Sequence, residues 1–513
     1  MMKSALSTPS SGQDYTVQLS YPNQIGMFAR IAHTIGAHGG DLGDINIVAP
    51  GSKLMTRGLN IRARNEDHLN KIIAAVRNLE HVKVVGILDP VLRMHQGGKI
   101  SVQSKMPIAS RETLSMAYTP GVARVSTAIA QDHSKVWSLT TKCNSVAVVS
   151  DGTAVLGLGD IGPEAAMPVM EGKAMLFKEF GDIDAYPICL KTKDPAQIVE
   201  TVANLSVGFG GINLEDISAP RCFEIEEQLQ QRLDIPVFHD DQHGTAIVVL
   251  AGLLNAVRLT GQKLSRIRIT ISGAGAAGMA ITKMLLQSGA KDVIVCDRQG
   301  TLHEGRAAEL NPSKLWLAQH TNPRRLAGSL EDALRGANVF IGVSAPGLLN
   351  AKAIKRMASK PIVFALSNPV PEIMPEEAGK HAFIVATGRS DYPNQINNVL
   401  AFPGVFRGAL NVRAGKISDQ MKNAAARAIA ACVDPQELAP DHIVPSVFDR
   451  SVVEQVAKAV EQAAVRSGVA KQPEALVTRV DLGSPQTLRQ VTPPVPRRHD
   501  SRKALTQAAR LMA

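Results

Sequence analysis

The first ninety residues alternate between two hydrophobic periods. Residues 14–20 alternate polar and apolar side chains, which predicts a strand, and apolar residues from Ile25 to Ile35 then recur at helical spacing. Strands are then predicted at residues 44–49 and 54–63, a helix at 66–78 and a last strand at 82–89. This βαββαβ order is that of the ferredoxin-like fold, so we expect a separate module over residues 14–95.

A second pattern marks the centre of the chain. Residues 267–297 begin as an apolar strand, cross a glycine-rich turn, continue with helical periodicity and end as a strand; the turn comprises Gly273, Ala274, Gly275, Ala276, Ala277 and Gly278. Such a turn lets backbone amides approach a pyrophosphate, which predicts a doubly wound, Rossmann-type α/β domain that binds a dinucleotide. The competing interpretation is a sheet of this type whose turn binds nothing.

The end of that second strand bears on the choice of cofactor. Asp297 is placed to accept a hydrogen bond from a ribose hydroxyl, which favours NAD. Arg298 follows it directly and offers a charge that pairs with a 2′-phosphate, so NADP is the alternative.

Composition excludes several classes of protein. The 513 residues suffice for about three domains, and 45% of them are hydrophobic, as in folded globular chains. The longest apolar run, residues 246–254, is much shorter than the roughly 20 residues of a membrane helix, and the first residues lack the apolar block of a signal peptide. Five scattered cysteines argue against a disulfide framework or a zinc cluster, so we expect a cytoplasmic protein with no membrane partner.

Half of the net charge of +10 lies in one segment. From Lys471 onward the chain has eight basic and three acidic residues, a net charge of +5, in a proline-containing stretch without clear periodicity. We therefore expect a basic tail over residues 471–513, in addition to a short disordered tail over residues 1–13. No nucleic-acid motif accompanies these charges, so we expect no nucleic-acid partner.

Two acidic pairs precede the glycine-rich turn. Glu215 and Asp216 in GINLEDIS, and Asp240 and Asp241 in VFHDDQHGTA, each follow a short apolar run that predicts a strand. Neighbouring side chains point to opposite faces of a strand, so a pair converges on one ion only where the chain leaves the strand. Hard oxygen ligands suit Mg²⁺ or Mn²⁺ rather than zinc. Exposed acids in loops are the alternative.

Six segments together resemble the motifs of malic enzymes, in the same order and with similar spacing: MAYTPGVA (116–123), DGTAVLGLGDIGPEAAMPVMEGKAMLFKEFG (151–181), LEDI, FHDDQHGTA, ALSNP (365–369) and ATGRSDYPNQINNVLAFPGVFRGAL (386–410). The resemblance covers residues 100–470 and is closest to the short bacterial form of the family. It implies oxidative decarboxylation of L-malate to pyruvate and CO₂, reduction of NAD(P)⁺, and a requirement for Mg²⁺ or Mn²⁺.

The resemblance also implies roles for single residues. It makes Tyr118 the proton donor and Lys173 the general base, with Asp240 beside Lys173 to orient it. For the metal and the substrate it implies two further sets: Glu215, Asp216 and Asp241 as metal ligands, and Asn368 and Asn398 as amides that bind a malate carboxylate. A lysine must be neutral to take the C2 hydroxyl proton, so we expect burial or nearby cations to lower the pKa of Lys173.

One position departs from the family's large forms. They place a substrate-binding arginine in the DGxxxLGLGD segment, where this chain has Ala154. Another cation must then neutralise the substrate carboxylate. Lys142, Arg124 and a cation from a partner subunit are the candidates.

The N-terminal segment YPNQIGMFARIAHTIGAHGGDLGDINIV resembles the opening of ACT domains, regulatory modules that pair and bind small effectors. A module that only dimerises the enzyme is the alternative, and we expect a homodimer or a higher homo-oligomer. The expected domains are the ACT module at 14–95, a substrate and metal domain at 96–242, and a dinucleotide-binding domain at 243–470 that two alanine-rich helices at 415–432 and 449–467 complete.

Three other functions compete with this interpretation. A malolactic enzyme would use a related site and release lactate with no net reduction of its cofactor. An amino-acid dehydrogenase would also combine a Rossmann-type domain with a catalytic lysine, but it leaves the acidic residues unexplained. A non-catalytic sensor would keep the ACT module and an inactive cleft.

Overall fold

The computed structural model describes residues 13–472. The tails that we expect at 1–13 and 471–513 lie outside the described residues, except that Gln13 already belongs to the first strand and Lys471 and Gln472 end the described chain.

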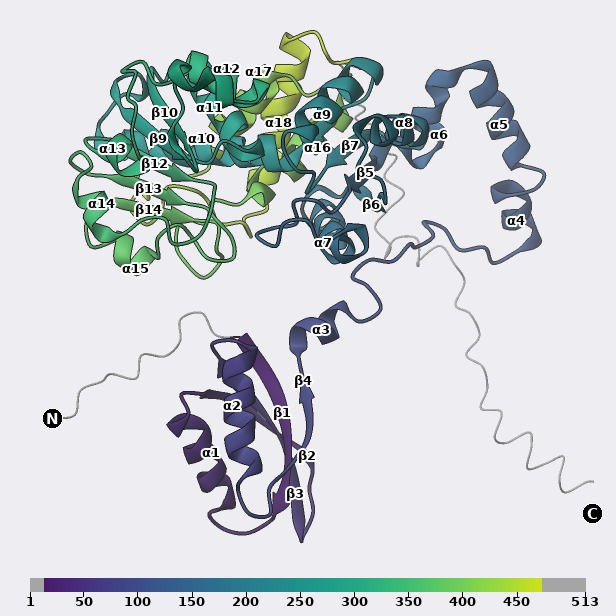
Figure 1. Cartoon of the computed structure of the whole chain (residues 1–513). Helices are drawn as coiled ribbons and strands as arrows, with labels where there is room; N and C mark the ends of the chain where they lie inside the picture. The colour runs from purple at the N-terminus through teal and green to yellow at the C-terminus, as the bar shows by residue number, and fades with distance from the viewer. Residues whose placement is uncertain (1–12, 473–513) are drawn as a thin grey trace, which may run out of the picture. The chain divides into compact units, whose positions relative to one another are not determined.

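The N-terminal module is an antiparallel sheet with two helices on one face (Figure 1). Its elements are β1 (Gln13–Pro22), α1 (Met27–Ala37), β2 (Asp41–Ala49), β3 (Leu54–Ala63), α2 (Glu66–Arg77) and β4 (Lys83–Leu88). The strand order β2-β3-β1-β4 is that of the ferredoxin-like fold, so this prediction is confirmed. Every second residue of β1 is buried, from Tyr15 to Tyr21, because one face of the strand packs against the helices.

The segment that follows is made of short helices with no buried residues. They are α3 (Pro90–His95), α4 (Arg111–Ala117), α5 (Val122–Gln131) and α6 (Val136–Leu139), together with the 3₁₀ turns His133–Lys135 and Thr141–Asn144. Apolar side chains are nevertheless frequent here and are exposed, among them Val102, Ile108 and Met116.

The first of two parallel sheets has the strand order β6-β5-β7-β8. Its strands are β5 (Ser145–Ser150), β6 (Asp184–Cys189), β7 (Gly211–Leu214) and β8 (Val237–His239), and its helices are α7 (Pro163–Gly181), α8 (Pro195–Leu205) and α9 (Arg221–Arg232) with the 3₁₀ turn Ser206–Gly208. Strand β5 is buried along its whole length, as expected of a strand covered on both faces.

Helix α10 (Asp240–Thr260) leads from β8 to the second sheet. By length and composition it is apolar enough to cross a membrane, but 67% of the apolar window is buried inside the protein. It packs against α11 (Ala276–Gln287) and α17 (Asp419–Ala431), as a core helix does. Its first two residues are the acidic pair Asp240 and Asp241.

The second sheet has the order β11-β10-β9-β12-β13-β14, in which all neighbours are parallel except β10 and β11. The strands are β9 (Arg268–Ser272), β10 (Asp292–Asp297), β11 (Gly300–Thr301), β12 (Val339–Gly342), β13 (Ile362–Ala365) and β14 (Ile384–Thr387). Numbered from β9, this is the order 3-2-1-4-5-6 of the Rossmann fold, which confirms the predicted fold class. The remaining short elements are α12 (Pro312–His320), α13 (Leu330–Leu334), α14 (Ala351–Lys355), α15 (Pro375–Ala378) and the 3₁₀ turns Leu264–Arg266, Glu304–Glu309 and Asn398–Leu400.

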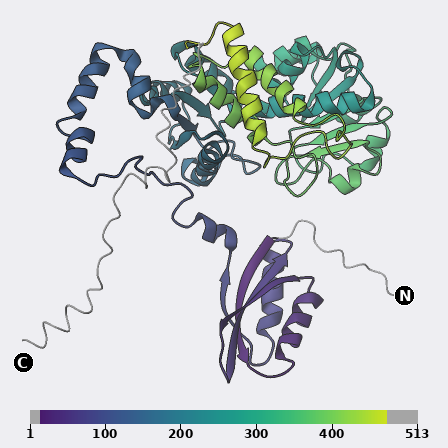
Figure 2. The ribbon, with the colours of Figure 1, turned by 180° about the vertical axis from the view of Figure 1, so that it is seen from behind.

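Three C-terminal helices connect the two parallel sheets. They are α16 (Phe402–Asn411), α17 and α18 (Ser451–Arg466), and α18 packs on both of the others (Figure 2). The predicted pair of alanine-rich helices, α17 and α18, is therefore present. Their neighbour α16 packs against α7 of the first sheet: the ring centroids of Phe402 and Phe406 lie 4.7 Å and 5.2 Å from that of Phe177 in α7. This contact brings the segment around Phe402 to the helix that carries Lys173.

Candidate functional site

The four acidic residues converge at the carboxyl ends of two adjacent strands. Glu215 and Asp216 directly follow β7, and Asp240 and Asp241 directly follow β8. Asp216 has a φ of 55°, so the chain turns sharply after the strand and its carboxylate does not continue the strand's alternation. Carboxylate oxygens of Glu215, Asp216 and Asp241 lie within 4.8 Å of one another. The structure thus brings together the three residues that the sequence analysis assigns to a metal.

Lys173 lies in the middle of this cluster. Its Nζ is 2.5 Å from Oδ2 of Asp240 and 2.9 Å from Oε1 of Glu215, and it lies 4.3 Å from the ring centroid of Phe402. Asn398 donates its Nδ2 proton to the same Oδ2 of Asp240 at 2.7 Å. Asp240 therefore holds both the amine and the amide, and both are residues that the family resemblance places in the site.

A glycine makes room for this arrangement. A Cβ atom on Gly244, one turn into α10, would lie 1.9 Å from Oδ1 of Asp240. No larger residue fits at that position while Asp240 keeps its place. The glycine of the HGTA segment is thus part of the site's packing.

The carboxylates are under strong electrostatic strain without a cation. Burial, followed by repulsion from Asp241, raises the pKa of Asp216 to about 8, and burial raises that of Glu215 well above its usual range. Oδ2 of Asp216 is buried and has no hydrogen-bond partner among the described residues. A divalent cation bound by three oxygen ligands would relieve both effects, so the donor set fits Mg²⁺ or Mn²⁺.

The expected lowering of the Lys173 pKa is wrong for the protein residues without a bound cation. Burial acts to lower it, but the charges of Asp240 and Glu215 outweigh burial and raise the pKa of Lys173 above its ordinary value. The amine is therefore an ammonium ion while those carboxylates are its only counter-charges. Sequence reasoning missed this because it considered burial without the number of acidic neighbours.

Two predicted residues do not join the buried cluster. Tyr118 ends α4 with a side chain that is 67% exposed, and its hydroxyl makes no hydrogen bond within residues 13–472. Asn368 is exposed too, and it lies against the GLGD segment: a Cβ atom on Gly157 would be 2.0 Å from the Asn368 carbonyl oxygen. The ALSNP and GLGD motifs therefore meet, although they are far apart in the sequence.

The segment with Ala154 lies directly beside the acids. The backbone N–H of Ala154 donates to the carbonyl oxygen of Asp216 at 2.9 Å. Of the candidate cations, Lys142 donates its Nζ protons to the carbonyl oxygens of Ser206 and Val207, which precede β7 and so lie at the opposite end of that strand from the acids. Lys142 of the same subunit is therefore not the missing cation. Arg124 is exposed, and its side chain forms no hydrogen bond with the part of the chain that the structure describes.

Arg221 is a further cation near this segment, and no sequence pattern predicts its position. Arg221 Nη2 lies 3.0 Å from Oδ2 of Asp151 and 3.0 Å from Oγ1 of Thr153, the latter next to Ala154. Its charge is thus matched by the buried Asp151. A single arginine at the start of a helix gives no sequence signal for this contact.

The glycine-rich turn has the geometry that phosphate binding needs. Gly273 has a φ of 119°, and a Cβ atom on Gly278 would lie 1.9 Å from the Gly273 carbonyl oxygen. Helix α11 begins at Ala276, followed by Ala277, and no side chain caps its first turn. A Cβ on Gly275 would meet no atom within 4 Å. The backbone amides of this turn are therefore accessible to the phosphates of a dinucleotide.

Asp297 is already satisfied by protein donors. Its two oxygens accept from Arg306 Nη1 and Nη2 at 3.0 Å and 3.1 Å, from Lys314 Nζ at 2.8 Å and from the Gln299 amide at 3.0 Å. Burial opposes ionisation, but the hydrogen bonds from Arg306 and Lys314 outweigh it and lower the pKa of Asp297 to about 2. A ribose hydroxyl would have to share these oxygens. Arg298, by contrast, is exposed and forms no side-chain hydrogen bond in the described range 13–472.

Comparisons with known proteins show which family this chain is similar to. The family model of the malic enzyme N-terminal domain matches residues 97–230, and that of the malic enzyme NAD-binding domain matches residues 242–465. The NAD-dependent malic enzyme of Geobacillus stearothermophilus is 55% identical over 461 residues, 90% of this chain and 96% of its own length. The bifunctional malic/malolactic enzyme of Bacillus subtilis is 53% identical over 75% of this chain and 95% of its own.

A solved structure gives the same result. The NAD-dependent malic enzyme of Thermotoga maritima is 52% identical, with a TM-score of 0.70 over 72% of this chain and 98% of its own. Neither matched family model extends into the N-terminal module, so its membership of the ACT family stays a prediction.

Prediction on metal binding. Asp216, whose folded-state pKa of about 8 is raised above its unfolded value, must lose its proton when a cation binds. The dissociation constant for Mn²⁺ should therefore fall by about tenfold per pH unit between about pH 6 and pH 8 for the proton of Asp216, and more steeply where Glu215 also loses a proton. By the same linkage, the folded metal-free protein binds more protons than the unfolded chain, so its stability should fall as pH rises through that range. Mn²⁺ titrations of the metal-free protein at several pH values measure the effect, and a dissociation constant that does not vary with pH would contradict it.

Proposed function

Because the chain belongs to the malic enzyme family, we propose that it converts L-malate to pyruvate and CO₂ with reduction of a nicotinamide cofactor. The observation that carries this proposal is the buried Lys173–Asp240 pair beside the three clustered carboxylates. A base, its orienting carboxylate and a set of hard oxygen ligands are what abstraction of a hydroxyl proton followed by decarboxylation requires.

Each group of the cluster has a chemical task. Lys173 accepts the C2 hydroxyl proton of malate, and Asp240, which also accepts from Asn398, fixes the position of its Nζ atom. The amide of Asn398 has a second proton for the malate carboxylate that the family resemblance assigns to it. Glu215, Asp216 and Asp241 would hold Mg²⁺ or Mn²⁺, which when bound supplies Lewis-acid stabilisation of negative charge on substrate oxygens. The turn from Gly273 to Gly278 would hold the cofactor that accepts the hydride. Asn368, at the exposed end of the ALSNP segment, contributes an amide to a substrate carboxylate.

We propose NAD⁺ as the preferred acceptor, with NADP⁺ as a weaker one. Asp297 supports NAD⁺ because a carboxylate at the end of this strand disfavours a 2′-phosphate, and the Geobacillus relative is named NAD-dependent. Arg306 and Lys314 offset part of that repulsion, since two cations surround the one carboxylate. NADP⁺ is therefore disfavoured rather than excluded.

We propose that a second copy of the chain completes the site with Tyr118. The exposed tyrosine lies between α4 and α5, helices without a buried residue, and exposed apolar side chains surround it in sequence: Val102, Met106, Ile108, Leu114, Met116 and Val122. Exposed apolar side chains of this kind mark a surface that is stabilised by packing on another surface. In a symmetric homodimer each segment would deliver its tyrosine to the partner's site, where it protonates C3 of the product enolate.

The N-terminal module is the proposed regulatory part. Its ferredoxin-like strand order is compatible with the ACT domains that its sequence resembles, and as such a domain it would bind a small effector. The match to the enzyme from Thermotoga maritima covers 98% of that enzyme but only 72% of this chain. Most of the unmatched part of this chain therefore has no counterpart in the Thermotoga enzyme. The catalytic part of the family thus exists without this module.

Prediction on catalysis. With L-malate, Mn²⁺ and NAD⁺, the protein should produce reduced cofactor and CO₂ in equal amounts, and a chelator should stop the reaction. Lys173→Met should lower kcat by about 10²–10⁴-fold, the usual contribution of a general base. The matched control is Lys178→Met on the same helix, where the side chain is 54% exposed and pairs with Asp182; its kcat should be nearly unchanged.

Other outcomes of this assay would point to other functions. Lactate and CO₂ without net cofactor reduction would indicate malolactic chemistry, which the name of the Bacillus relative includes. No turnover with either cofactor would favour the non-catalytic sensor.

Prediction on assembly. Tyr118→Phe and Lys173→Met should each be nearly inactive alone. If Tyr118 acts in the partner's site, unfolding and refolding the two variants together should restore about a quarter of the wild-type activity, because half of the dimers are mixed and each has one complete site. Absence of any recovery would assign Tyr118 to the site of its own subunit.

Prediction on regulation. Removal of residues 1–95 should leave kcat with NAD⁺ nearly unchanged and shift the malate concentration needed for half-saturation, because the proposed module acts on the site from outside. Malate saturation curves of the full and the shortened chain measure this. Identical curves would show that the module does not regulate malate use.

A further inference from the structure

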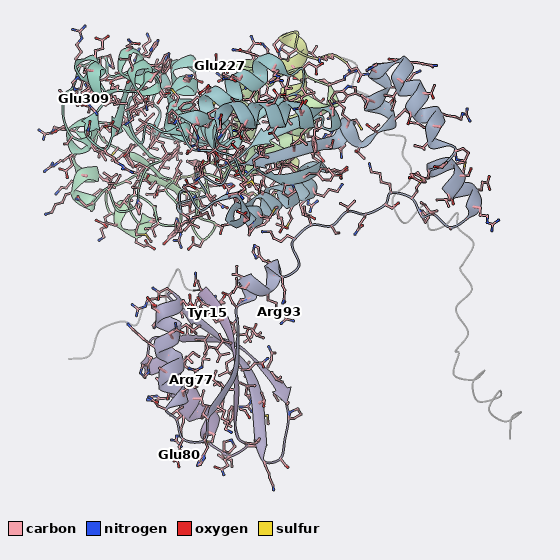
Figure 3. All side chains as sticks on the ribbon, turned by 45° about the vertical axis from the view of Figure 1, so that its right-hand side comes forward. Tyr15, Arg77, Glu80, Arg93, Glu227 and Glu309 are labelled. Atoms are coloured by element: carbon pink, nitrogen blue, oxygen red, sulfur yellow. The ribbon has the colours of Figure 1, made fainter. Side chains whose placement is uncertain are left out.

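Helix α9 has a carboxylate where an apolar residue is expected. Its buried residues are Cys222, Ile225, Glu226 and Leu229, the i, i+3, i+4, i+7 stripe of an amphipathic helix. Glu226 therefore lies on the core face, where a charge is costly unless it is matched by hydrogen bonds. Glu227, the next residue, lies on the exposed side of the same helix (Figure 3).

The hydrogen bonds of Glu226 go to the segment that carries the acids after β8. Its Oε1 accepts from the backbone N–H of His239 at 3.0 Å, and its Oε2 accepts from Nε2 of Gln242 at 3.1 Å. Nε2 of His243 lies 3.0 Å from both oxygens, and Gln230 Nε2 donates to Oε1 at 3.2 Å. Three of the four donor groups thus flank Asp240 and Asp241 in the chain.

The histidine in this set is held in one tautomer. Lys422 Nζ, from α17, lies 3.4 Å from Nδ1 of His243, and an ammonium group can only donate. Nδ1 is then the acceptor, and Nε2 carries the proton that Glu226 receives. The contact is therefore directional and ties α9, α10 and α17 to one carboxylate.

We propose that Glu226 is a positioning residue for the metal: by accepting hydrogen bonds from His239, Gln242 and His243 it fixes the segment that carries Asp241, and so sets the affinity of the site for a divalent cation. The inference rests on the metal site proposed above. Groups that orient metal ligands typically change metal affinity by about 10–100-fold when they are replaced. Glu226 is not one of the three clustered ligands, so its effect on metal binding passes through residues 239–243.

The test is a titration of metal-free full-length protein with Mn²⁺, in which the free ion is counted by its electron paramagnetic resonance signal. Glu226→Gln should raise the dissociation constant by about 10–100-fold. Glu226→Asp, which keeps the charge, should recover part of the affinity, and Glu227→Gln should match the wild type.

Three results would overturn the proposal. If Glu226→Gln lowers the unfolding temperature but leaves the Mn²⁺ dissociation constant unchanged, Glu226 only stabilises the fold. If the wild type and Asp241→Asn bind Mn²⁺ equally, the metal site itself is wrong, and the proposal fails with it. Should Glu226→Gln not fold, His243→Leu removes one donor from the set and must raise the dissociation constant, with His243→Gln recovering part of the affinity; an unchanged value for His243→Leu rejects the proposal.

Discussion

Repulsion among buried carboxylates is the constraint around which the catalytic part is organised. Four acidic side chains and one lysine share a volume that is mostly closed to water, and a single ammonium ion cannot balance them. The excess negative charge is met in part by protons, as the raised pKa values of Glu215 and Asp216 show, and a divalent cation would take the place of those protons. The same excess keeps Lys173 charged. Binding of a cation to the carboxylates and release of the proton from the base are therefore linked by electrostatics, whatever the order of the two events.

The fold provides the means to hold such a cluster. Parallel strands place their carboxyl ends at one edge of a sheet, so residues after β7 and after β8 meet there although 24 positions separate Asp216 from Asp240. Lys173 reaches them from α7, and Asn398 and Phe402 reach them from the chain beyond the second sheet. Asn398 and Phe402 thus belong in sequence to the dinucleotide-binding part but contact Asp240 and Lys173 of the acidic cluster. This arrangement places the base within the same packed unit as the fold that binds the cofactor.

Local patterns were sufficient to predict some of these features and not others. The βαββαβ module and the strand, turn and helix around Gly273 follow from hydrophobic period and glycine chemistry, which depend on neighbours in the sequence. The acids at the strand ends could be found because each pair stands directly after an apolar run. The hydrogen bonds from Arg306 and Lys314 to Asp297 could not be predicted in this way. Those donors are 9 and 17 positions away and contact Asp297 only in the folded chain. The charge state of Lys173 was missed for the same reason: it depends on the sum of neighbours that the topology assembles.

Two buried glutamates, Glu226 and Glu372, hold loops of the site through hydrogen bonds. Glu226 binds the segment after β8, and Glu372, which is fully buried, accepts from the backbone N–H groups of Ser344 and Ser367 at 2.9 Å and 3.1 Å. Ser344 follows β12 closely and Ser367 precedes Asn368, so Glu372 joins the ends of two neighbouring strands next to a proposed substrate amide. Its place requires a glycine, because a Cβ atom on Gly342 would lie 2.4 Å from Cδ of Glu372. A loop rich in backbone donors gains little from apolar packing, whereas a buried carboxylate can satisfy several of those donors at once. Glu226 and Glu372 are therefore buried for a reason other than apolar packing: each orders backbone groups of a loop at the site.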